Sequence, residues 1–452
     1  MVVAKEIGYP TRGCKERDAA LMRRFLRPAL IRRFFASLRE EGLRMALHKA
    51  RIYLGMQWRG HAPSVLAGGN TGGGPETSLH GIWAEMARGD GFHVTRSLAD
   101  GPRIALIGDL NLAQCRKYRI EQLAEFWEAQ GVRCDYSHYQ DVPRATRILQ
   151  QATHLCEYRL QASPLTQMYR YEARRLGLPI LYDIDDPLFS VSAYETYQNM
   201  AMLDPGLKAH FLNEAPKYAA MMEGADLVTL STPGLVEHAS LYTRRPTYLR
   251  RNFADQATLE NGATAMAARE SDDLFRVVFA SGSQGHEADF DLIRDQVSAF
   301  VTADPNRRLT ILGHFQLDHL PEALAAQVEH HPFSQYDQYL ARLAGADVAL
   351  MPLQDDIFNR CKSGVRVIDA ASVGLPAIVS SVGDLPNLVR DGETGFVAAA
   401  PGDWTAALEA LAADPTRRAA MRAATRQDLE TRWSAQAADH IISPEVLAWI
   451  RT

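Results

Sequence analysis

A lysine and an aspartate, Lys362 and Asp369, stand seven positions apart in a stretch expected to form a loop and then a helix. Lys362 lies in the polar turn 359–364, and apolar residues then recur at helical spacing through 365–372. Seven positions are about two helical turns, so both side chains project from roughly the same side. Backbone N–H groups at a helix start attract anions, and an ammonium group adds three donors. The pair could bind the diphosphate and the ribose hydroxyls of a nucleotide; alternatively, Lys362 is an ordinary surface lysine beside a helix cap.

Small residues and a histidine follow a strand expected at 275–280. They are Ser281, Gly282, Ser283 and His286. Small residues allow backbone amides to approach a phosphate or a sugar closely. His286 could hydrogen-bond either group, and the alternative for this histidine is a capping role at the start of the next helix.

Charged residues gather at the carboxyl ends of strands expected in the first half of the chain. They are Arg119, Arg159, Asp183, Asp185 and Asp186, which follow the strands expected at 103–108, 154–158 and 179–182. The carboxyl ends of parallel strands meet at one edge of a sheet, so these side chains are expected to lie near one another. Asp183 and Asp185 could hold Mg²⁺ or Mn²⁺, or one of them could cap the next helix or pair with an arginine.

Expected strands and helices alternate from residue 102 onward. Further strands are expected at 132–136, 226–230, 247–249, 309–313, 347–352 and 377–380, and helices at 118–130, 164–176, 205–223, 233–242, 287–302, 321–328, 335–344, 403–413, 415–430 and 433–450. This alternation predicts an α/β chain with parallel, doubly wound sheets. The polar segment 253–273 lacks hydrophobic periodicity and is interpreted as a linker between two domains.

The first hundred residues stand outside this pattern. Residues 1–60 contain 14 Lys and Arg but five Asp and Glu, although the whole chain has a net charge of −5. Residues 19–58 are predicted to form a basic amphipathic helical arm, which could bind an anionic membrane surface or pack on protein. The basic excess is local and carries no binding motif, so a nucleic-acid partner is not expected. The glycine-rich segment 68–74 is interpreted as a flexible linker.

The sequence predicts a cytoplasmic protein. Its five cysteines lack metal-ligand spacing, which favours reduced thiols. There is no apolar run long enough to predict a membrane span, and the first residues lack the apolar core of a secretion signal. The basic arm leaves open a peripheral position on the inner face of the membrane.

Motifs in the second half resemble the donor-binding segment of glycosyltransferase family 4 and its relatives, the glycosyl transferases group 1. They are Lys362-Ser363, Asp369-Ala370, Gly374-Leu375-Pro376, Asp391-Gly392-Glu393-Thr394-Gly395 and the pattern from Ser281 to Phe290. In the first half, the run from Tyr182 to Asp186 and the Tyr118-Arg119 pair are also similar to these bacterial enzymes. The resemblance extends from residue 102 to about residue 435.

This resemblance implies a GT-B fold, in which two Rossmann-like domains, 101–252 and 274–415, face each other across a cleft. Residues 253–273 would join them, residues 416–452 would cross back to the first domain, and residues 1–100 would carry the arm and the glycine-rich linker. The implied activity is that of a retaining glycosyltransferase. It would move a sugar from a nucleotide-sugar donor to a glycan, a lipid-linked acceptor or a protein in polysaccharide or glycoconjugate synthesis. GT-B enzymes generally need no metal, so no cofactor is expected, Mg²⁺ and Mn²⁺ included.

The resemblance also implies roles for the candidate residues. The expected donor-binding residues are Ser281, Gly282, Ser283, His286, Arg360, Lys362, Ser363 and Asp369. Asp183, Asp185 and Arg159 are the expected catalytic residues, with one aspartate orienting an acceptor hydroxyl or touching the transferred sugar. Arg119 and Asp186 are expected on the acceptor side.

Two departures from the family pattern keep alternatives open. Many members carry two glutamates separated by seven residues, whereas this chain has Cys361 at the first position and Asp369 at the second. Members often carry a basic residue near position 283, but this sequence has none between Arg276 and Arg294. The alternatives are a non-catalytic scaffold or sugar-binding subunit of a polysaccharide assembly, and a sugar-nucleotide epimerase on the same fold.

Overall fold

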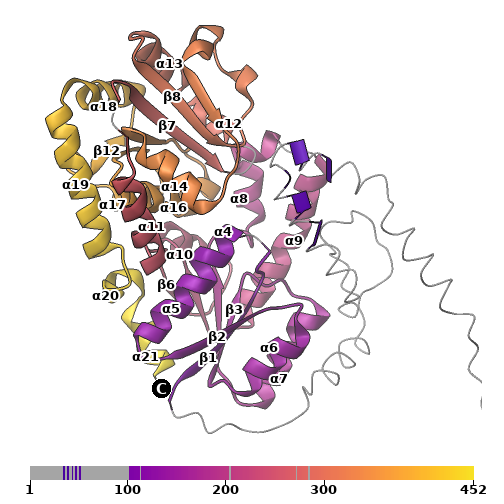
Figure 1. Ribbon diagram of the computed structural model, residues 1–452. Helices are drawn as coiled ribbons and strands as arrows, with labels where there is room; N and C mark the ends of the chain where they lie inside the picture. Colours follow the sequence, from indigo (N-terminus) through magenta and orange to yellow (C-terminus); the bar gives the residue numbers. More distant parts are fainter. Residues whose placement is uncertain are drawn as a thin grey trace, which may run out of the picture. The chain divides into compact units, whose positions relative to one another are not determined.

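The computed structural model describes residues 101–451 except 112, 203–204, 271 and 283–285, together with a few helical positions between 34 and 51. The chain divides into two compact units, residues 1–70 and 71–452, and the second unit carries both sheets (Figure 1). Most of the expected arm 19–58, the glycine-rich segment and Ser283 lie outside the described residues, so the predictions for them stay predictions. Within the described part, no helix is long and apolar enough to cross a membrane.

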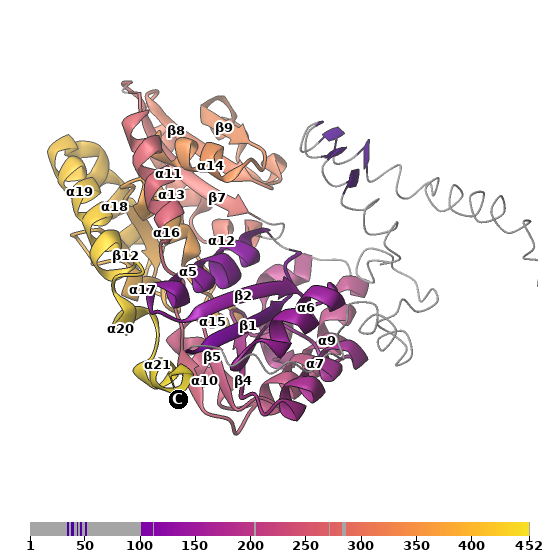
Figure 2. The ribbon, with the colours of Figure 1, turned by 60° about the horizontal axis from the view of Figure 1, so that its bottom comes forward.

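Six parallel strands form the first sheet, in the order β2-β1-β3-β4-β5-β6. Figure 2 shows β1 and β2 side by side. They are β1 (Arg103–Gly108), β2 (Arg133–His138), β3 (His154–Tyr158), β4 (Ile180–Ile184), β5 (Leu227–Leu230) and β6 (Thr247–Leu249). Parallel pairing brings the carboxyl ends of these strands to one edge, where Arg159 and Asp185 leave the sheet.

Helices cover both faces of this sheet. Ile104 of β1 packs in one core with α5 (Gln122–Ala129), whereas its neighbour Ala105 packs in another with α6 (Val142–Gln150) and α7 (Pro164–Arg175). Neighbouring residues of a strand point to opposite faces of the sheet, so these two cores show that both faces are buried. The remaining helices are α4 (Ala113–Cys115), the π-helix η2 (Arg116–Glu121), α8 (Val191–Thr196), η3 (Gln198–Met202), α9 (Pro205–Glu223) and α10 (Pro233–Ala239).

The second sheet also has six parallel strands, in the order β12-β11-β10-β7-β8-β9. They are β7 (Phe275–Gly282), β8 (Arg307–Gly313), β9 (Val328–His331), β10 (Val348–Met351), β11 (Ala377–Ser380) and β12 (Gly395–Ala398). The helices are α11 (Gln256–Ala267), α12 (Glu287–Asp291), α13 (Arg294–Thr302), η4 (Leu317–His319), η5 (Glu322–Gln327), α14 (Tyr336–Ala344), α15 (Ile357–Cys361), α16 (Val365–Ser372), α17 (Leu385–Leu388), α18 (Pro401–Ala413) and α19 (Pro415–Arg432). Together the two sheets confirm the predicted pair of Rossmann-like domains.

The last two helices pack on the first sheet. They are α20 (Ala438–Ile441) and α21 (Pro444–Ile450). The backbone N–H of Arg251, just after β6, donates to the carbonyl of Ile441 at 2.7 Å. Val446 and Ile450 are buried in the same core as Ile104 and Trp127. The end of the chain therefore contributes to the core of the first domain.

Several elements differ from the sequence expectation. The helix predicted at 433–450 is two short helices, α20 and α21, and the helices α8 and η3 were not predicted. The polar segment 253–273 contains helix α11, a strand (β9) lies at the end of the helix predicted at 321–328, and the predicted turn 359–364 begins inside α15. The helix in the linker escaped prediction because its buried face is made of small residues. Gly262 lies so close to the carbonyl of Ser372 that an added Cβ would clash with it, and such close packing leaves no pattern of large apolar residues.

Candidate functional site

Lys362 follows α15 and reaches an aromatic pair. Its Nζ donates a hydrogen bond to the hydroxyl of Tyr197 at 2.6 Å and lies 4.8 Å from the centroid of the Tyr197 ring. That ring stacks on Phe358, with centroids 4.3 Å apart. Tyr197 follows β4 and α8 of the first domain, so a side chain from each domain meets at this ammonium group. Two of the three ammonium hydrogens remain for a ligand.

A second cation lies one turn further along the chain, and the sequence analysis missed it. Arg366 in the first turn of α16 donates from Nη1 to the carbonyl of Ala280 at 2.9 Å, at the carboxyl end of β7. The available signal was a basic residue in the first turn of the helix expected at 365–372, where backbone N–H groups already favour an anion. Arg360, which the sequence analysis assigned to the donor, is exposed and binds Asp355 at 2.6 Å instead.

Two predicted donor-binding residues lie beside Arg366 at the end of β7. Ser281 is completely buried, and its Oγ has no hydrogen-bond partner in the described part of the chain. A buried hydroxyl without a partner costs about 1–3 kcal/mol, which makes it a candidate for a contact with a ligand. Gly282 ends the strand, and Ser283 follows outside the described residues.

His286 is held in one orientation by a buried aspartate. Its Nδ1 lies 3.1 Å from Asp289 Oδ2, and Asp289 also accepts hydrogen bonds from Asn199 at 2.9 Å and from the backbone N–H of Gln354 at 3.0 Å. Burial lowers the pKa of His286 to about 4, and the charges of Lys362 and Arg366 act in the same direction. Its imidazole is therefore neutral at pH 7, with the proton on Nδ1, so Nε2 acts as a hydrogen-bond acceptor.

Asp369 lies on the buried face of α16. Its Oδ1 accepts hydrogen bonds from the hydroxyl of Tyr118 and, at 2.7 Å, from that of Tyr336. Burial raises the pKa of this carboxyl group, although Lys117 and both phenols act against that shift. The predicted ribose-binding carboxylate is thus oriented by two phenols, one from each domain.

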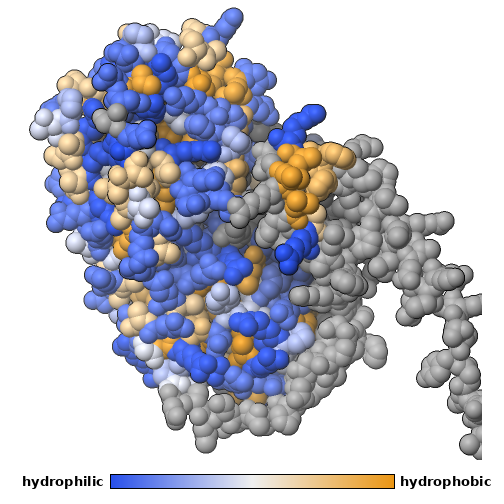
Figure 3. Space-filling model, in the orientation of Figure 1, coloured by the Kyte–Doolittle hydropathy of each residue, from blue (hydrophilic) through white to orange (hydrophobic). Residues whose placement is uncertain are grey.

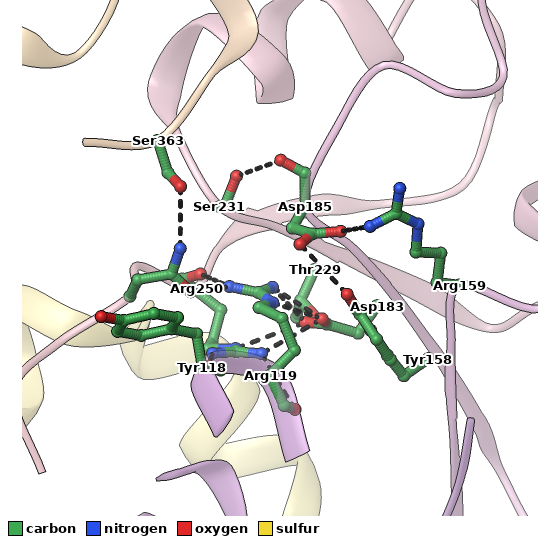
Figure 4. A network of polar contacts seen from close by, with 11 residues as sticks. Tyr118, Arg119, Tyr158, Arg159, Asp183, Asp185, Thr229, Ser231, Arg250 and Ser363 are labelled. Atoms are coloured by element: carbon green, nitrogen blue, oxygen red, sulfur yellow. Dashed lines mark hydrogen bonds and ion pairs between the residues drawn. The ribbon is translucent and has the colours of Figure 1, made fainter. Parts of the chain in front are cut away.

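Asp183 and Arg119 form the centre of a buried ion pair (Figure 4). The carboxylate of Asp183 accepts from Arg119 at 2.6 Å, from Arg250 at 3.1 Å and from the hydroxyl of Thr229 at 2.7 Å. Both Asp183 and Arg119 are fully buried, so neither side chain faces a substrate in this structure. The catalytic role expected for Asp183 and the acceptor-side role expected for Arg119 stay predictions, and the contacts of both side chains here are those of a buried structural ion pair.

The same network reaches the loop of Lys362. Arg119 donates from Nη1 to Asn252 Oδ1 at 3.0 Å, and Asn252 donates to Ser363 Oγ at 2.8 Å (Figure 4). Ser363, a predicted donor-binding residue, therefore fixes its loop to the first domain. Arg250 and Asn252 were missed in the sequence, although they follow β6 at the same edge of the sheet.

Arg159 has an unusual backbone and two carboxylate partners. Its φ is 52°, in the left-handed region, and it is the only non-glycine residue with a positive φ in the described part of the chain. Its guanidinium lies 3.5 Å from Asp185 Oδ1 and 3.7 Å from Asp186 Oδ2, and Asp185 Oδ2 accepts from Tyr158 at 3.0 Å (Figure 4 shows the pairing with Asp185). Such a backbone conformation costs about 1–3 kcal/mol and often marks a functional site.

Asp186 is the most accessible of the three predicted aspartates. Its side chain is 28% exposed, against 14% for Asp185 and 1% for Asp183. Burial and the neighbouring Asp185 raise its pKa, and the charges of Arg159 and Lys362 oppose the shift. The carboxylates at the edge of the first sheet and the lysine of the second domain therefore lie within electrostatic range of each other.

Cys361 stands where many family members carry the first glutamate, and its side chain lies inside the protein. Cys361 is buried, and its Sγ lies 3.8 Å from the carbonyl of Gly234. Burial raises the pKa of this thiol to about 12, so it stays protonated at neutral pH. Among the described residues there is no cluster of three His, Cys, Asp or Glu side chains suited to holding a metal ion.

Comparisons with known proteins match the second domain most clearly. Residues 275–414 match the family described as glycosyl transferases group 1. A D-inositol 3-phosphate glycosyltransferase of Paenarthrobacter aurescens is 32% identical over 25% of this chain and 29% of its own length. Another, from Corynebacterium aurimucosum, is 24% identical over 59% of this chain and 58% of its own length. The chain thus spans less than two thirds of these relatives.

Solved structures match over both sheets. Sucrose-phosphate synthase from Thermosynechococcus elongatus is 16% identical with a TM-score of 0.52, over 77% of this chain and all of that structure. A glycosyltransferase from Rickettsia africae is 9% identical with a TM-score of 0.51, over 78% and 98%. Anabaena HepE, crystallised with UDP, is 13% identical with a TM-score of 0.50, over 77% and 100%. The chain therefore has the GT-B fold, and its residues 275–414 match the model of the glycosyl transferases group 1 family.

Proposed function

We propose that the protein is a glycosyltransferase that takes its sugar from a nucleoside diphosphate sugar. The observation that carries this proposal is the arrangement at the carboxyl end of β7. Arg366 contacts this end at the carbonyl of Ala280, and the charges of Lys362 and Arg366 both act on His286, which follows the strand. The buried hydroxyl of Ser281 has no hydrogen-bond partner there among the described residues. Two cations and a hydroxyl donor suit the two phosphates of such a donor.

The remaining donor contacts follow from the same geometry. Asp369 would accept hydrogen bonds from ribose hydroxyls. His286 would accept one from a hydroxyl of the transferred sugar, because its Nε2 has no proton to offer a phosphate. The UDP bound to HepE, a protein of the same fold, supports a nucleotide ligand in this family of folds.

The acceptor would bind at the edge of the first sheet, against Asp185, Asp186 and Arg159. Of the three, Asp186 is best suited to orient the attacking hydroxyl, since it is the most exposed carboxylate and lies in the field of Lys362. We propose transfer with retention. The bond from the anomeric carbon to the diphosphate breaks with its electron pair on the phosphate, the acceptor oxygen attacks the same face, and its proton passes to the leaving phosphate. Lys362 and Arg366 would stabilise the charge that develops there.

The few described residues of the first unit favour an acceptor that is held at a membrane. Phe35, Leu43 and Leu47 are exposed, and hydrophobic side chains gather at these helical positions (Figure 3). Exposed apolar residues on a strongly basic segment suit an anionic membrane surface. We propose a peripheral position on the inner membrane face, with a lipid-linked glycan as the favoured acceptor class and a free glycan or a protein as the other candidates.

A second candidate is a sugar-nucleotide-binding protein that does not transfer the sugar. The observation that favours it is Cys361, since the position that carries a glutamate in many relatives holds a buried, protonated thiol. Such a protein would use the same cations to bind a donor but would leave the donor intact.

Turnover of a panel of sugar nucleotides separates these functions. We expect the wild type to release a nucleoside diphosphate slowly from one donor, since water can replace the acceptor, and Lys362→Ala to lose at least tenfold in this rate. Lys217→Ala is the matched control, because Lys217 is exposed on α9 and pairs with Glu214. Binding without release, with or without extracts of lipid-linked acceptor, would favour the non-catalytic candidate. A changed sugar still attached to its nucleotide would show an epimerase.

A further inference from the structure

We propose that Tyr118 and Tyr336 are positioning residues for Asp369: both phenols donate to Oδ1, which fixes the carboxylate and leaves Oδ2 to accept the ribose hydroxyls. This inference rests on the proposed function, because it assumes that a nucleotide binds at Asp369. It adds two residues to which the sequence analysis assigned no role.

The two phenols converge on one oxygen from different parts of the chain. Tyr118 belongs to the π-helix η2 of the first domain, and Tyr336 is the first residue of α14 in the second. Both hydroxyls bind Oδ1 of Asp369, and no described residue donates a hydrogen bond to Oδ2. A carboxylate has room for about four hydrogen bonds, two at each oxygen, so Oδ1 is filled and Oδ2 remains available.

A partly buried lysine contacts both rings. The Nζ of Lys117 lies 3.8 Å from the ring centroid of Tyr336 and 4.6 Å from that of Tyr118. The same ammonium donates to Thr258 Oγ1 at 2.6 Å and lies 4.0 Å from Asp255 Oδ1. Cation–π contacts are stronger where they are shielded from water. Lys117 therefore orders the two aromatic rings whose hydroxyls point at Asp369.

The phenols also favour the ionised form of the Asp369 carboxylate, which accepts hydrogen bonds. Asp369 is buried, and burial favours its neutral form, which could donate one hydrogen bond but would accept fewer. Two hydroxyl donors and the nearby Lys117 favour the ionised form, which only accepts. A ribose presents two neighbouring hydroxyl donors, and an ionised Oδ2 has two lone pairs to meet them.

The origin of Tyr118 in the first domain has a functional consequence. The ribose contact depends on a hydrogen bond between the two domains, so the nucleotide senses whether the first domain is in place. On Lys362, the hydroxyl of Tyr197 makes a comparable contact from the same domain. The donor site is thus completed by two tyrosines of the first domain.

A comparison of nucleotides with and without ribose hydroxyls tests the inference. We would measure by calorimetry the binding of UDP and of 2′,3′-dideoxy-UDP to the wild type, Tyr118→Phe and Tyr336→Phe, with GDP and ADP and their dideoxy forms if the wild type does not bind UDP. We expect each variant to bind the ribose nucleotide about tenfold more weakly and the dideoxy nucleotide unchanged. Tyr339→Phe is the matched control, because Tyr339 lies one turn along α14 and makes no hydrogen bond to Asp369 in the described part of the chain.

Other results would overturn the inference in distinguishable ways. Equal losses for the ribose and dideoxy nucleotides would mean that the tyrosines only maintain the fold, and unchanged binding of both would mean that they do not matter. Should Tyr118→Phe fail to fold, Tyr336→Phe alone decides between these outcomes. If the wild type bound none of the three nucleoside diphosphates, the proposed function would fail together with the inference.

Discussion

Asp183 and Asp186 stand three positions apart but have opposite environments. Asp183 is fully buried between Arg119 and Arg250, whereas the side chain of Asp186 is 28% exposed. We expect Asp183→Asn to lower the free energy of unfolding by about 3–5 kcal/mol, because it leaves two buried guanidinium groups without their counter-charge. Asp186→Asn should cost less than about 1 kcal/mol. Urea denaturation of both variants measures the two losses of unfolding free energy. Equal losses would contradict the different environments described for Asp183 and Asp186.

The pKa of Asp186 predicts how activity depends on pH. Burial and Asp185 raise this pKa, and Arg159 and Lys362 oppose the shift without cancelling it. If the ionised carboxylate orients the acceptor, activity should fall on acidification at a pH above the usual aspartate range. We expect Asp186→Asn to have a low kcat/KM that does not fall further on acidification. The kcat/KM of Asp186→Glu should still fall at acidic pH. A fall on acidification that is unchanged in the Asn variant would exclude Asp186 as its source.

At the scale of elements, Asp289 joins α12 to η3 of the first domain. It accepts hydrogen bonds from His286 and from Asn199, and its pKa is lowered to about 2 although burial alone would raise it. A carboxyl group whose pKa is lower in the folded state stabilises the fold above its unfolded pKa, and this contribution is lost as pH falls toward 2. We expect Asp289→Asn to remove about 2 kcal/mol at pH 7.

The check on Asp289 is a comparison of unfolding free energies at several pH values. The difference between the wild type and Asp289→Asn should be largest near neutral pH and shrink as the pH approaches 2. A difference that stays constant with pH would mean that the substitution acts through packing and not through the carboxylate charge.

Elements whose buried face consists of large apolar residues could be predicted from the sequence. Elements whose buried face consists of small residues, or which are only partly buried, could not. The strands at 103–108 and 377–380 have the predicted bounds, because buried parallel strands read as nearly continuous apolar runs. Helix α11 was missed because Gly262 and its small neighbours carry no such run. The polar segment Val328–His331 was missed as a strand because it lies at the sheet edge and is only partly buried.

The candidate site divides in the same way. Lys362 and Asp369 could be found because their motif is local in sequence. Tyr118 could not be assigned to Asp369, since 251 positions separate them and only the folded chain brings the two together. Asp183, Asp185 and Asp186 could not be told apart in the sequence, because an aspartate looks the same there whether its side chain faces the core or a ligand. Their different burial becomes visible only in the folded chain.

At the scale of the whole molecule, the C-terminal helix ties the last residues to the first sheet. Ile450 of α21 is buried in the core that contains Ile104 and Trp127. We expect Ile450→Ala to lower the free energy of unfolding by about 2–5 kcal/mol. Glu445→Ala, on the exposed side of the same helix, should cost less than about 1 kcal/mol. Guanidinium denaturation distinguishes them; a small cost for Ile450→Ala would mean that α21 is dispensable for the first domain.

The central claim is that Lys362 and Arg366 bind the diphosphate of a sugar nucleotide, and calorimetric titration with nucleoside diphosphates tests it most directly. Lys362→Ala and Arg366→Ala should each weaken the binding of the preferred nucleotide at least tenfold, because each removes a positive charge that acts on the region of His286, just after β7. Arg360→Ala should change it less than about twofold, since Arg360 is exposed and paired with Asp355. Loss of binding in Arg360→Ala, or full binding in the other two variants, would contradict the account.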